Sequence, residues 1–237
     1  MATADNGFIR FSDTLEGCEC SPFIVIKSIG DLKFYVKGIV GSVIFVTTIS
    51  GESLHLDGYQ PSDEWFSWNY DLSTILACGD CFRLRIDKDG TSLYSSIIVY
   101  DSNIDNTILL KYSCEQPAFG IEYSDDKYSQ VRIPAILDEA NYNKEESIYT
   151  DSNGKRRVLF RDIRKKYQLK VDFLPEWVHD NIMLALSHDH VFIDGVEMDI
   201  DGDYSIDWEN VDDSACDDLV MAECTMLENF IQRNSNC

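Results

Sequence analysis

The chain has 237 residues, of which 44% are hydrophobic and 12% aromatic, which is enough for a packed core and excludes a disordered chain. Its formal net charge of −22 argues against a general phosphate-backbone binder and against docking to an anionic membrane surface. The length predicts one large or two smaller domains.

The N-terminal residues, MATADNGFIRFSD, show no basic region followed by an apolar run, so no signal peptide is predicted. No apolar run approaches the roughly 20 residues that span a bilayer. We therefore expect a soluble chain made in a cytoplasm, with its eight cysteines as reduced thiols. Residues 1–19 are interpreted as an N-terminal arm.

Two cysteine pairs are candidate metal ligands, CEC (Cys18, Cys20) and CGDC (Cys78, Cys81). Together they contain four thiolates, the number that a structural zinc takes. A CxC pair is a poor chelate for that geometry, and CGDC precedes a strand instead of opening a helix as a redox motif does. The pattern favours thiols without metal, and a zinc site remains the alternative.

Strand-forming runs dominate residues 20–114. They are FIVIKS, KFYVKG, SVIFVTTIS, SLHL, FRLRI, LYSSIIVY and TILLKYS. Turn signals at intervals of about 8–12 residues predict a β-sandwich of the immunoglobulin or fibronectin type. The cysteine–tryptophan hallmark of true immunoglobulin domains is missing, so this comparison concerns architecture only.

The stretch DEWFSWNY offers a candidate ligand platform. Trp65, Trp68 and Tyr70 are aromatic side chains of the kind that stack on sugar rings. In a strand, however, Phe66, Trp68 and Tyr70 share one face, and apolar alternation usually marks the buried face. The pattern favours core residues over a platform.

The series of predicted strands is interrupted at CEQPAFG. We place a domain boundary there, before a second β-rich domain, residues 119–228. Its predicted strands are YSQVRIPAIL, a hairpin in SIYTDSNGKRRVLF about Asn153-Gly154, and KKYQLKVDFL. A helix is predicted over residues 175–187, because a proline stands near its first turn and apolar residues follow at helical spacing.

Residues 188–210 contain two histidines and many carboxylates. An EF-hand calcium loop fails in two registers, because its final glutamate position falls on Trp208 or Asn210. The dipeptides Asp194-Gly195 and Asp201-Gly202 are typical of type I′ turns, and alternating strands lie between and after them. We therefore predict a three-stranded β-meander with a solvent-exposed acidic face.

His188 and His190 are interpreted as surface residues at the entrance of this meander. LVMAECTML alternates apolar and polar residues, which predicts a closing strand, with a helix as the alternative. Residues 229–237 are interpreted as a C-terminal tail. The chain is therefore expected to be mainly β, with two β-sandwich-like domains, the second with one α-helix and a C-terminal β-meander.

Catalytic signatures are missing from the sequence: there is no GxSxG elbow, HExxH, P-loop or Rossmann glycine fingerprint. Carboxylates are too plentiful for any pair of them to be selected as catalytic. We expect a protein that is not an enzyme and needs no cofactor.

Charge is distributed unevenly along the second half. Eight of the 20 basic residues lie within residues 155–170, and from Asp172 onward 17 acidic residues accompany one base, Arg233. The first interpretation is compensation inside one domain; the second is a contact in which the basic strip of one subunit meets the acidic face of the next. A role of the strip in binding nucleic acid is disfavoured by the negative surroundings. The interface residues of the second interpretation are Arg156, Arg157, Arg161, Arg164, Lys165 and Lys166.

Several stretches resemble structural proteins of tailed phages of gut Bacteroidetes, including crAss-like phages. They are EESIYTDSNGKRR, KKYQLKVDFLPEWVHDNIMLALSHDHVFIDG, DYSIDWEN and YDLSTILACGDCFRLRI. The resemblance implies a virion component of the neck or tail, such as a ring, connector or tail-tip protein, built from β-sandwich domains. It brings no catalytic residues.

The resemblance sets the expected partners and location. We expect a homo-oligomer, ring-like, that also contacts other virion proteins and binds neither nucleic acid directly nor a membrane. It is expected to be made in the cytoplasm of the bacterial host and to reside in the virion. The alternative is a carbohydrate-binding β-sandwich module of a gut bacterium, motivated by the aromatic run.

Overall fold

The computed structural model describes residues 3–4, 9, 11–12, 24–27, 31–56, 62–67, 72–73, 76–101, 103–118, 120–124, 126–138, 141–212 and 219–228. Within these ranges it describes all side chains except those of residues 3, 4, 12, 143–145, 159–162 and 209–212.

The described part is mainly β with one helix, as predicted. The strands of the first half are β1 (Thr3–Ala4), β2 (Phe11–Ser12), β3 (Ile24–Ile26), β4 (Lys33–Lys37), β5 (Val43–Thr48), β6 (Ser53–His55), β7 (Trp65–Ser67), β8 (Asp80–Lys88), β9 (Thr91–Ser95), β10 (Ile98–Tyr100) and β11 (Thr107–Ser113). The second half has β12 (Ser129–Leu137), β13 (Asn141–Thr150), β14 (Arg156–Pro175), α1 (Glu176–Leu186), β15 (His190–Ile193), β16 (Val196–Ile200), β17 (Ser205–Asp212) and β18 (Leu219–Glu228).

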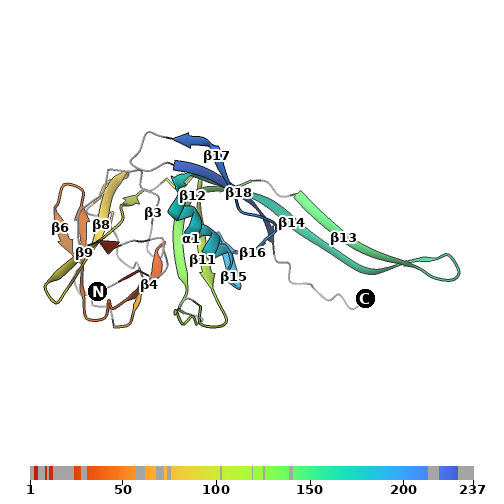
Figure 1. Cartoon of the computed structure of the whole chain (residues 1–237), viewed down its shortest axis with the longest axis horizontal. Helices are drawn as coiled ribbons and strands as arrows, with labels where there is room; N and C mark the ends of the chain where they lie inside the picture. Colours follow the sequence, from red (N-terminus) through yellow and green to blue (C-terminus); the bar gives the residue numbers. More distant parts are fainter. Residues whose placement is uncertain are drawn as a thin grey trace.

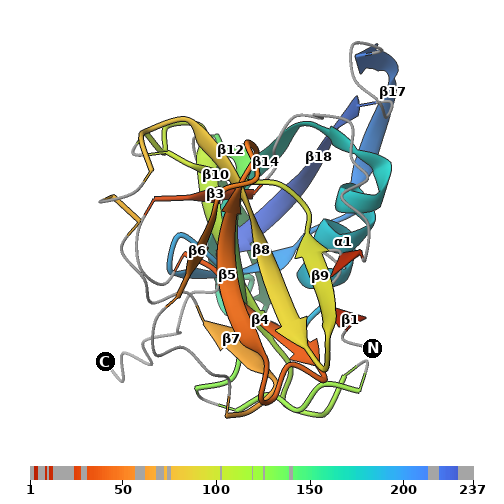
Figure 2. The ribbon, with the colours of Figure 1, turned by 90° about the vertical axis from the view of Figure 1, so that its left-hand side faces the viewer.

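The first half packs two sheets face to face. One sheet joins β2, β9, β8, β10 and β3, with β5 paired to β8 and β6 paired to β5, and it faces the viewer in Figure 2. Alternate residues of β8, among them Phe82 and Leu84, point into the core and are buried. Facing them, β4 buries Phe34, whose ring lies 4.9 Å from that of Phe66 in β7.

The second half closes a sheet on itself. Strands β11, β12, β14, β18, β16 and β15 pair in this order, and β15 returns to β11, every pair being antiparallel. Buried side chains from all six strands form its core: Ile108, Leu110, Tyr112, Val131, Ile133, Ala135, Leu169, Val171, Val191, Ile193, Met198, Ala222, Cys224 and Met226. Full closure leaves these six strands without open edges along the paired segments.

The expected division between two domains at residues 114–119 falls inside this closed sheet. Strand β11, which precedes the division, pairs with both β12 and β15, which follow it. Lys33 in β4 also pairs with Gln130 in β12, and buried residues of both halves form one hydrophobic cluster. The two halves therefore share a core.

The three strands of the predicted meander are present as β15, β16 and β17, but only its first turn joins two strands that pair with each other. Asp194 and Gly195 have φ of 49° and 83°, and they join β15 to β16 as expected of a type I′ turn. At the second turn Gly202 alone has positive φ, and the amide of Asp201 donates to the carbonyl of Thr225 at 2.8 Å. The chain therefore continues along β18 instead of folding back on β16, so that β16 and β17 both pair with β18.

The helix and the last strand agree with the sequence. Helix α1 covers residues 176–186, inside the predicted 175–187, with Pro175 at its N-cap. LVMAECTML belongs to β18, a strand and not a helix, and its buried side chains alternate. In the described part of the chain, no helix is both long and apolar enough to cross a lipid bilayer.

Candidate functional site: a projecting hairpin

A two-stranded hairpin projects from the body of the molecule (Figure 1). It consists of β13, the tip loop and the first part of β14, residues 141–166, and we call it the projecting hairpin. Up to Lys165, β14 pairs with β13 alone; from Lys166 onward it pairs with β18 and then also with β12. At about 3.3 Å per residue, the ten residues of β13 extend about 33 Å.

The hairpin is longer than the sequence predicted. The end of the run SIYTDSNGKRRVLF and the run KKYQLKVDFL, predicted as separate elements, both belong to the 20-residue strand β14, which joins the projecting hairpin to the closed sheet. The beginning of β13, NYNKEE, was not predicted as a strand, because Asn, Lys and Glu are depleted in strands. Pairing with β14 overrides that local preference.

The tip is a tight loop organised by Asp151. Its amide donates to the carbonyl of Lys155 at 3.0 Å, and its Oδ1 accepts from the amides of Asn153 and Lys155 at 3.0 and 2.9 Å. Gly154 has φ of 76°, the left-handed conformation that glycine adopts without strain. The loop therefore turns the chain as predicted and places Lys155 and Arg156 at the far end of the projecting hairpin.

One face of the projecting hairpin carries four exposed apolar side chains interspersed with polar and charged residues such as Lys165 and Arg156, and we call it the apolar face. The register pairs Ile148 with Val158, Lys144 with Ile163 and Tyr142 with Lys165, so Tyr142, Ile148, Val158 and Ile163 share a face. Their exposed fractions are 69%, 39%, 48% and 46%. A two-stranded hairpin is marginal by itself in water, and a stripe of exposed apolar side chains marks an interaction surface.

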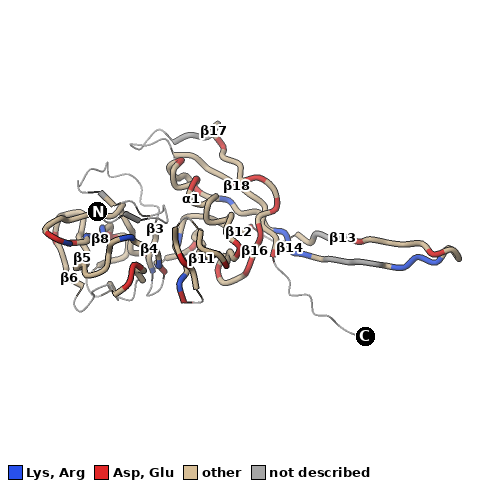
Figure 3. Tube along the Cα trace, turned by 60° about the horizontal axis from the view of Figure 1, so that its bottom comes forward, with Lys and Arg blue, Asp and Glu red and all other residues tan. Residues whose placement is uncertain are grey.

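The projecting hairpin also differs from the rest of the chain in charge. It contains eight basic and four acidic residues, whereas the remaining residues contain 12 basic and 38 acidic ones. Figure 3 shows the basic segments near the tip and at the root of the hairpin. A positive projection on a negative body favours an acidic docking surface.

The basic residues at the root are paired within the chain. Lys165 Nζ lies 3.6 Å from Glu228 Oε2, and Tyr167 Oη donates to the same oxygen at 2.9 Å. Lys166 Nζ lies 2.8 Å from Asp201 Oδ2. The negative charge of Glu228 raises the pKa of Lys165. These contacts fix the direction in which the hairpin leaves the body.

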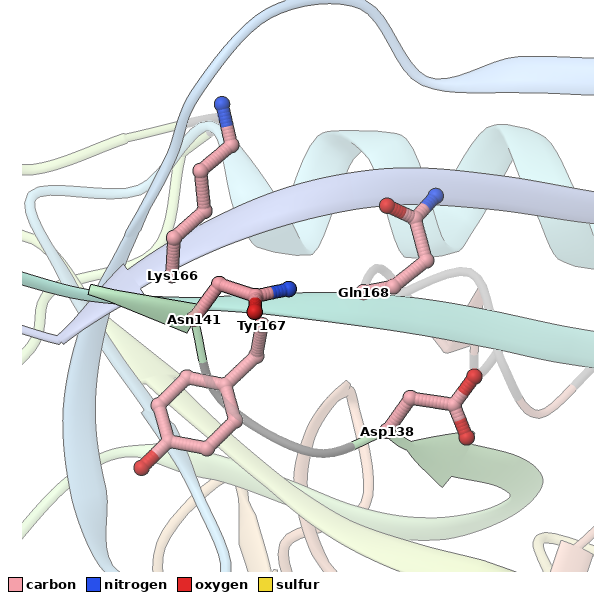
Figure 4. Close-up of a pocket in the computed structure, with 5 residues that line it drawn as sticks. All are labelled: Asp138, Asn141, Lys166, Tyr167 and Gln168. Carbon is pink, nitrogen blue, oxygen red and sulfur yellow. The ribbon is translucent and has the colours of Figure 1, made fainter. Parts of the chain in front are cut away.

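A shallow pocket lies beside this root (Figure 4). It is lined by Asp138, Asn141, Lys166, Tyr167 and Gln168. The side chains of Lys166 and Gln168 point to one side of β14 and that of Tyr167 to the other, as strand alternation requires. Asp138 Oδ2 forms an ion pair with Lys170 Nζ at 2.6 Å. The charges around this pocket therefore belong to the root contacts.

The structure separates the six residues predicted as an interface. Lys165 and Lys166 pair with carboxylates of their own chain, as the first interpretation of the charge pattern held. Arg156 and Arg157 lie near the tip and are exposed, and Arg157 also lies 3.4 Å from Asp151 Oδ2. Arg164 lies near the root, where it pairs with Asn143. The backbone of Arg161 pairs with Glu146 near the middle of the hairpin, and the side chain of Arg161 is not among those that the structure describes.

The candidate aromatic platform is not formed at Trp65. Trp65 is buried, and its ring meets those of Tyr35 and Tyr123 edge-on, at 5.8 and 5.7 Å. It packs in the core because β7 pairs with β4, which places its ring beside β4 residues. Trp68 and Tyr70 lie outside the described residues.

The candidate zinc ligands are placed in part. Cys78 is exposed, and its thiol donates to Asp101 Oδ1 at 2.8 Å. Burial raises the pKa of the Cys81 thiol, which disfavours a thiolate. Cys18 and Cys20 lie outside the described residues. Among the residues that the structure describes, no three His, Cys, Asp or Glu side chains gather in a metal-binding arrangement.

The histidines near the predicted meander are partly covered. His188 Nδ1 donates to the carbonyl of Leu184 at 2.8 Å, and its Nε2 lies 3.2 Å from Tyr123 Oη. His190 lies 3.1 Å from Glu197 and 3.7 Å from Glu115. Sequence reasoning missed His179, which is fully buried; it lies three residues before Ile182 on the inner face of α1, so helical spacing was the available signal.

Comparison of the chain with family models, with curated proteins and with solved structures returned no match. The resemblance to phage structural proteins therefore stays a prediction.

Proposed function

We propose that the protein is a non-enzymatic structural subunit of a tailed-phage virion, in the neck or tail, which is incorporated through its projecting hairpin. The observation that carries the proposal is the exposed apolar face of this hairpin, formed by Tyr142, Ile148, Val158 and Ile163. Ordering residues into a hairpin costs conformational entropy, and no core offsets that cost along these residues. A partner that covers the apolar face supplies the missing burial.

The construction of the root supports an assembly role. Strand β14 runs from the closed sheet directly into the hairpin, and Lys165, Lys166 and Tyr167 hold it to the body. An interaction element on a rigid root presents its surface in one direction, which reduces the entropy lost on binding. The phage resemblance supplies the setting, a ring, connector or tail-tip position.

The test compares the wild-type chain with a hairpin deletion. In the deletion, residues 143–164 are replaced by Asn-Gly, a two-residue turn between Tyr142 and Lys165, which are paired in the wild type. Both chains are produced in host cells that make the particles, and the purified particles are analysed by mass spectrometry. We expect the wild-type chain in the particles and the deletion absent from them.

Thermal melting controls for folding, because the deletion leaves the closed sheet and its core intact and should melt at the wild-type temperature. A deletion that enters particles normally would contradict the role of the hairpin. A wild-type chain that is absent from particles and binds glycans in a Trp68-dependent manner would replace the proposal with the carbohydrate-binding module.

A further inference from the structure

The surface that receives the projecting hairpin should be acidic and partly apolar. The tip supplies Lys155 and Arg156, and among the described side chains no carboxylate lies within 4 Å of either. Arg156 pairs with Thr150, on the same face as Ile148 and Val158. The distal end of the apolar face is therefore flanked by positive charge that no described carboxylate neutralises.

The outer face of α1 has the complementary composition. Glu176, Asp180, Met183 and Leu184 are exposed and follow one another at positions i, i+4, i+7 and i+8, on one side of the helix. The opposite side, which includes Val178 and Ile182, packs into the core. Among the described side chains, no Lys or Arg lies within 4 Å of the carboxylates of Glu176 and Asp180.

The distance between the charged residue and the apolar residue is similar on the projecting hairpin and on α1. Arg156 precedes Val158 by two strand residues, or about 7 Å. Asp180 precedes Met183 and Leu184 by three and four helical residues, or about 5–6 Å. The two surfaces therefore match in both character and scale.

We propose that the distal apolar face of the projecting hairpin docks on the outer face of α1 of a second copy of this chain, with Lys155 and Arg156 beside Glu176 and Asp180. The hairpin points away from the body that carries α1 (Figure 1), so it does not reach the helix of its own chain. The contact is heterologous, and repetition of such a contact closes a ring when the rotation between copies permits. The inference rests on the proposed function and names the partner of the same hairpin.

The experiment is a charge swap measured by sedimentation velocity on the purified chain over a range of concentrations. Lys155→Glu with Arg156→Glu, and separately Glu176→Lys with Asp180→Lys, should each raise the dissociation constant of the oligomer about tenfold or more, because attraction becomes repulsion. The four substitutions combined should restore the dissociation constant to within about threefold of the wild type, since the opposite charges face each other again.

A matched control reverses two exposed lysines of the first half, Lys27→Glu with Lys37→Glu, which changes the net charge by the same amount as the tip variant. This control should oligomerise like the wild type. Equal effects of the control and the tip variant would overturn the proposal, and so would failure of the combined variant to restore association.

The experiments distinguish failure of the inferred contact with a second copy from failure of the proposed virion function. If the wild-type chain stays monomeric at every concentration while the hairpin deletion is lost from particles, the partner is another virion protein and the inference fails alone. If the deletion enters particles normally, the proposed function fails, whatever the sedimentation result.

Discussion

The imidazole of His179 is enclosed between α1 and β18. Its Nε2 lies 2.8 Å from the carbonyl oxygen of Val220, which only accepts, so Nε2 carries the proton. Nδ1 then accepts from Tyr204 Oη at 2.7 Å. Both ring nitrogens are satisfied in the neutral form, and burial lowers the pKa of His179.

This arrangement predicts a loss of stability in mild acid. In the unfolded chain the imidazole takes up a proton near pH 6.5, whereas the folded chain does so only at lower pH. The free energy of unfolding should therefore fall as the pH decreases below about 6.5, by up to about 1.4 kcal/mol per pH unit until the folded pKa is reached. Urea unfolding of wild type and His179→Gln at pH 7 and pH 5 measures the difference, which should be smaller in the variant.

His188 needs a control because burial lowers its pKa as well. His188→Gln alone should retain the His179 contribution, and the double variant should lose both. An identical pH dependence in wild type and His179→Gln would show that the neutral imidazole does not stabilise the fold.

The burial of His179 could be predicted from the sequence, and its partners could not. Helical spacing places it beside Val178 and Ile182 on the inner face of α1. Tyr204 and Val220 lie 25 and 41 residues away, on segments whose pairing depends on β18. No local pattern contains that information.

At the scale of elements, local sequence signals predicted where the chain turns but not which strands pair after each turn. The hairpin tip at Gly154 was found because turn chemistry is local, but the length of the projecting hairpin depends on β14 continuing into the closed sheet. In the same way Asp201-Gly202 resembles a hairpin turn, yet the Asp201 amide finds a partner in β18. A turn dipeptide is a preference that long-range pairing overrides.

The single strand β14 should show two levels of stability. Opening its first part breaks only hairpin bonds to β13, a local event that costs little, whereas opening residues 167–171 breaks the closed sheet and its core. Amides of residues 156–164 should therefore exchange hydrogen at least about a hundredfold faster than those of residues 167–171.

Hydrogen exchange followed by mass spectrometry on the monomer measures this gradient. Oligomers need a separate measurement, because docking of the hairpin should slow exchange near the tip. Uniform protection along β14 in the monomer would show that the hairpin is stable without a partner.

At the scale of the whole molecule, the sequence showed the charge asymmetry but not how the fold divides it. The basic residues fall into two groups because β14 runs between the tip and the body. Lys165, Lys166 and Lys170 pair with acidic groups of the body, whereas Arg156 pairs with Thr150 beside the tip loop. The shared core could not be predicted either, because it depends on long-range strand pairing. The pairing of Lys33 with Gln130 joins residues nearly a hundred positions apart.

A buried ion pair crosses between the two halves. Arg132 of β12 lies 3.4 Å from Asp31, just before β4, and both side chains are almost completely buried. Asp31 also accepts from the amide of Lys27 at 2.8 Å, and Arg132 donates to Thr107 Oγ1 at 3.3 Å. The pair therefore links segments on either side of the expected domain division.

Removal of one partner should destabilise the whole molecule. Arg132→Met leaves the Asp31 carboxylate buried without its counter-charge, which should lower the free energy of unfolding by about 3–5 kcal/mol. Asp31→Asn in the same chain removes that charge and keeps an oxygen for the Lys27 amide, so the double variant should recover a large part of the loss. Because the core is shared, fluorescence and circular dichroism should report one coincident unfolding transition in urea for wild type and variants. Additive effects of the two substitutions would mean that the charges do not interact, and two separate transitions would mean that the halves fold independently.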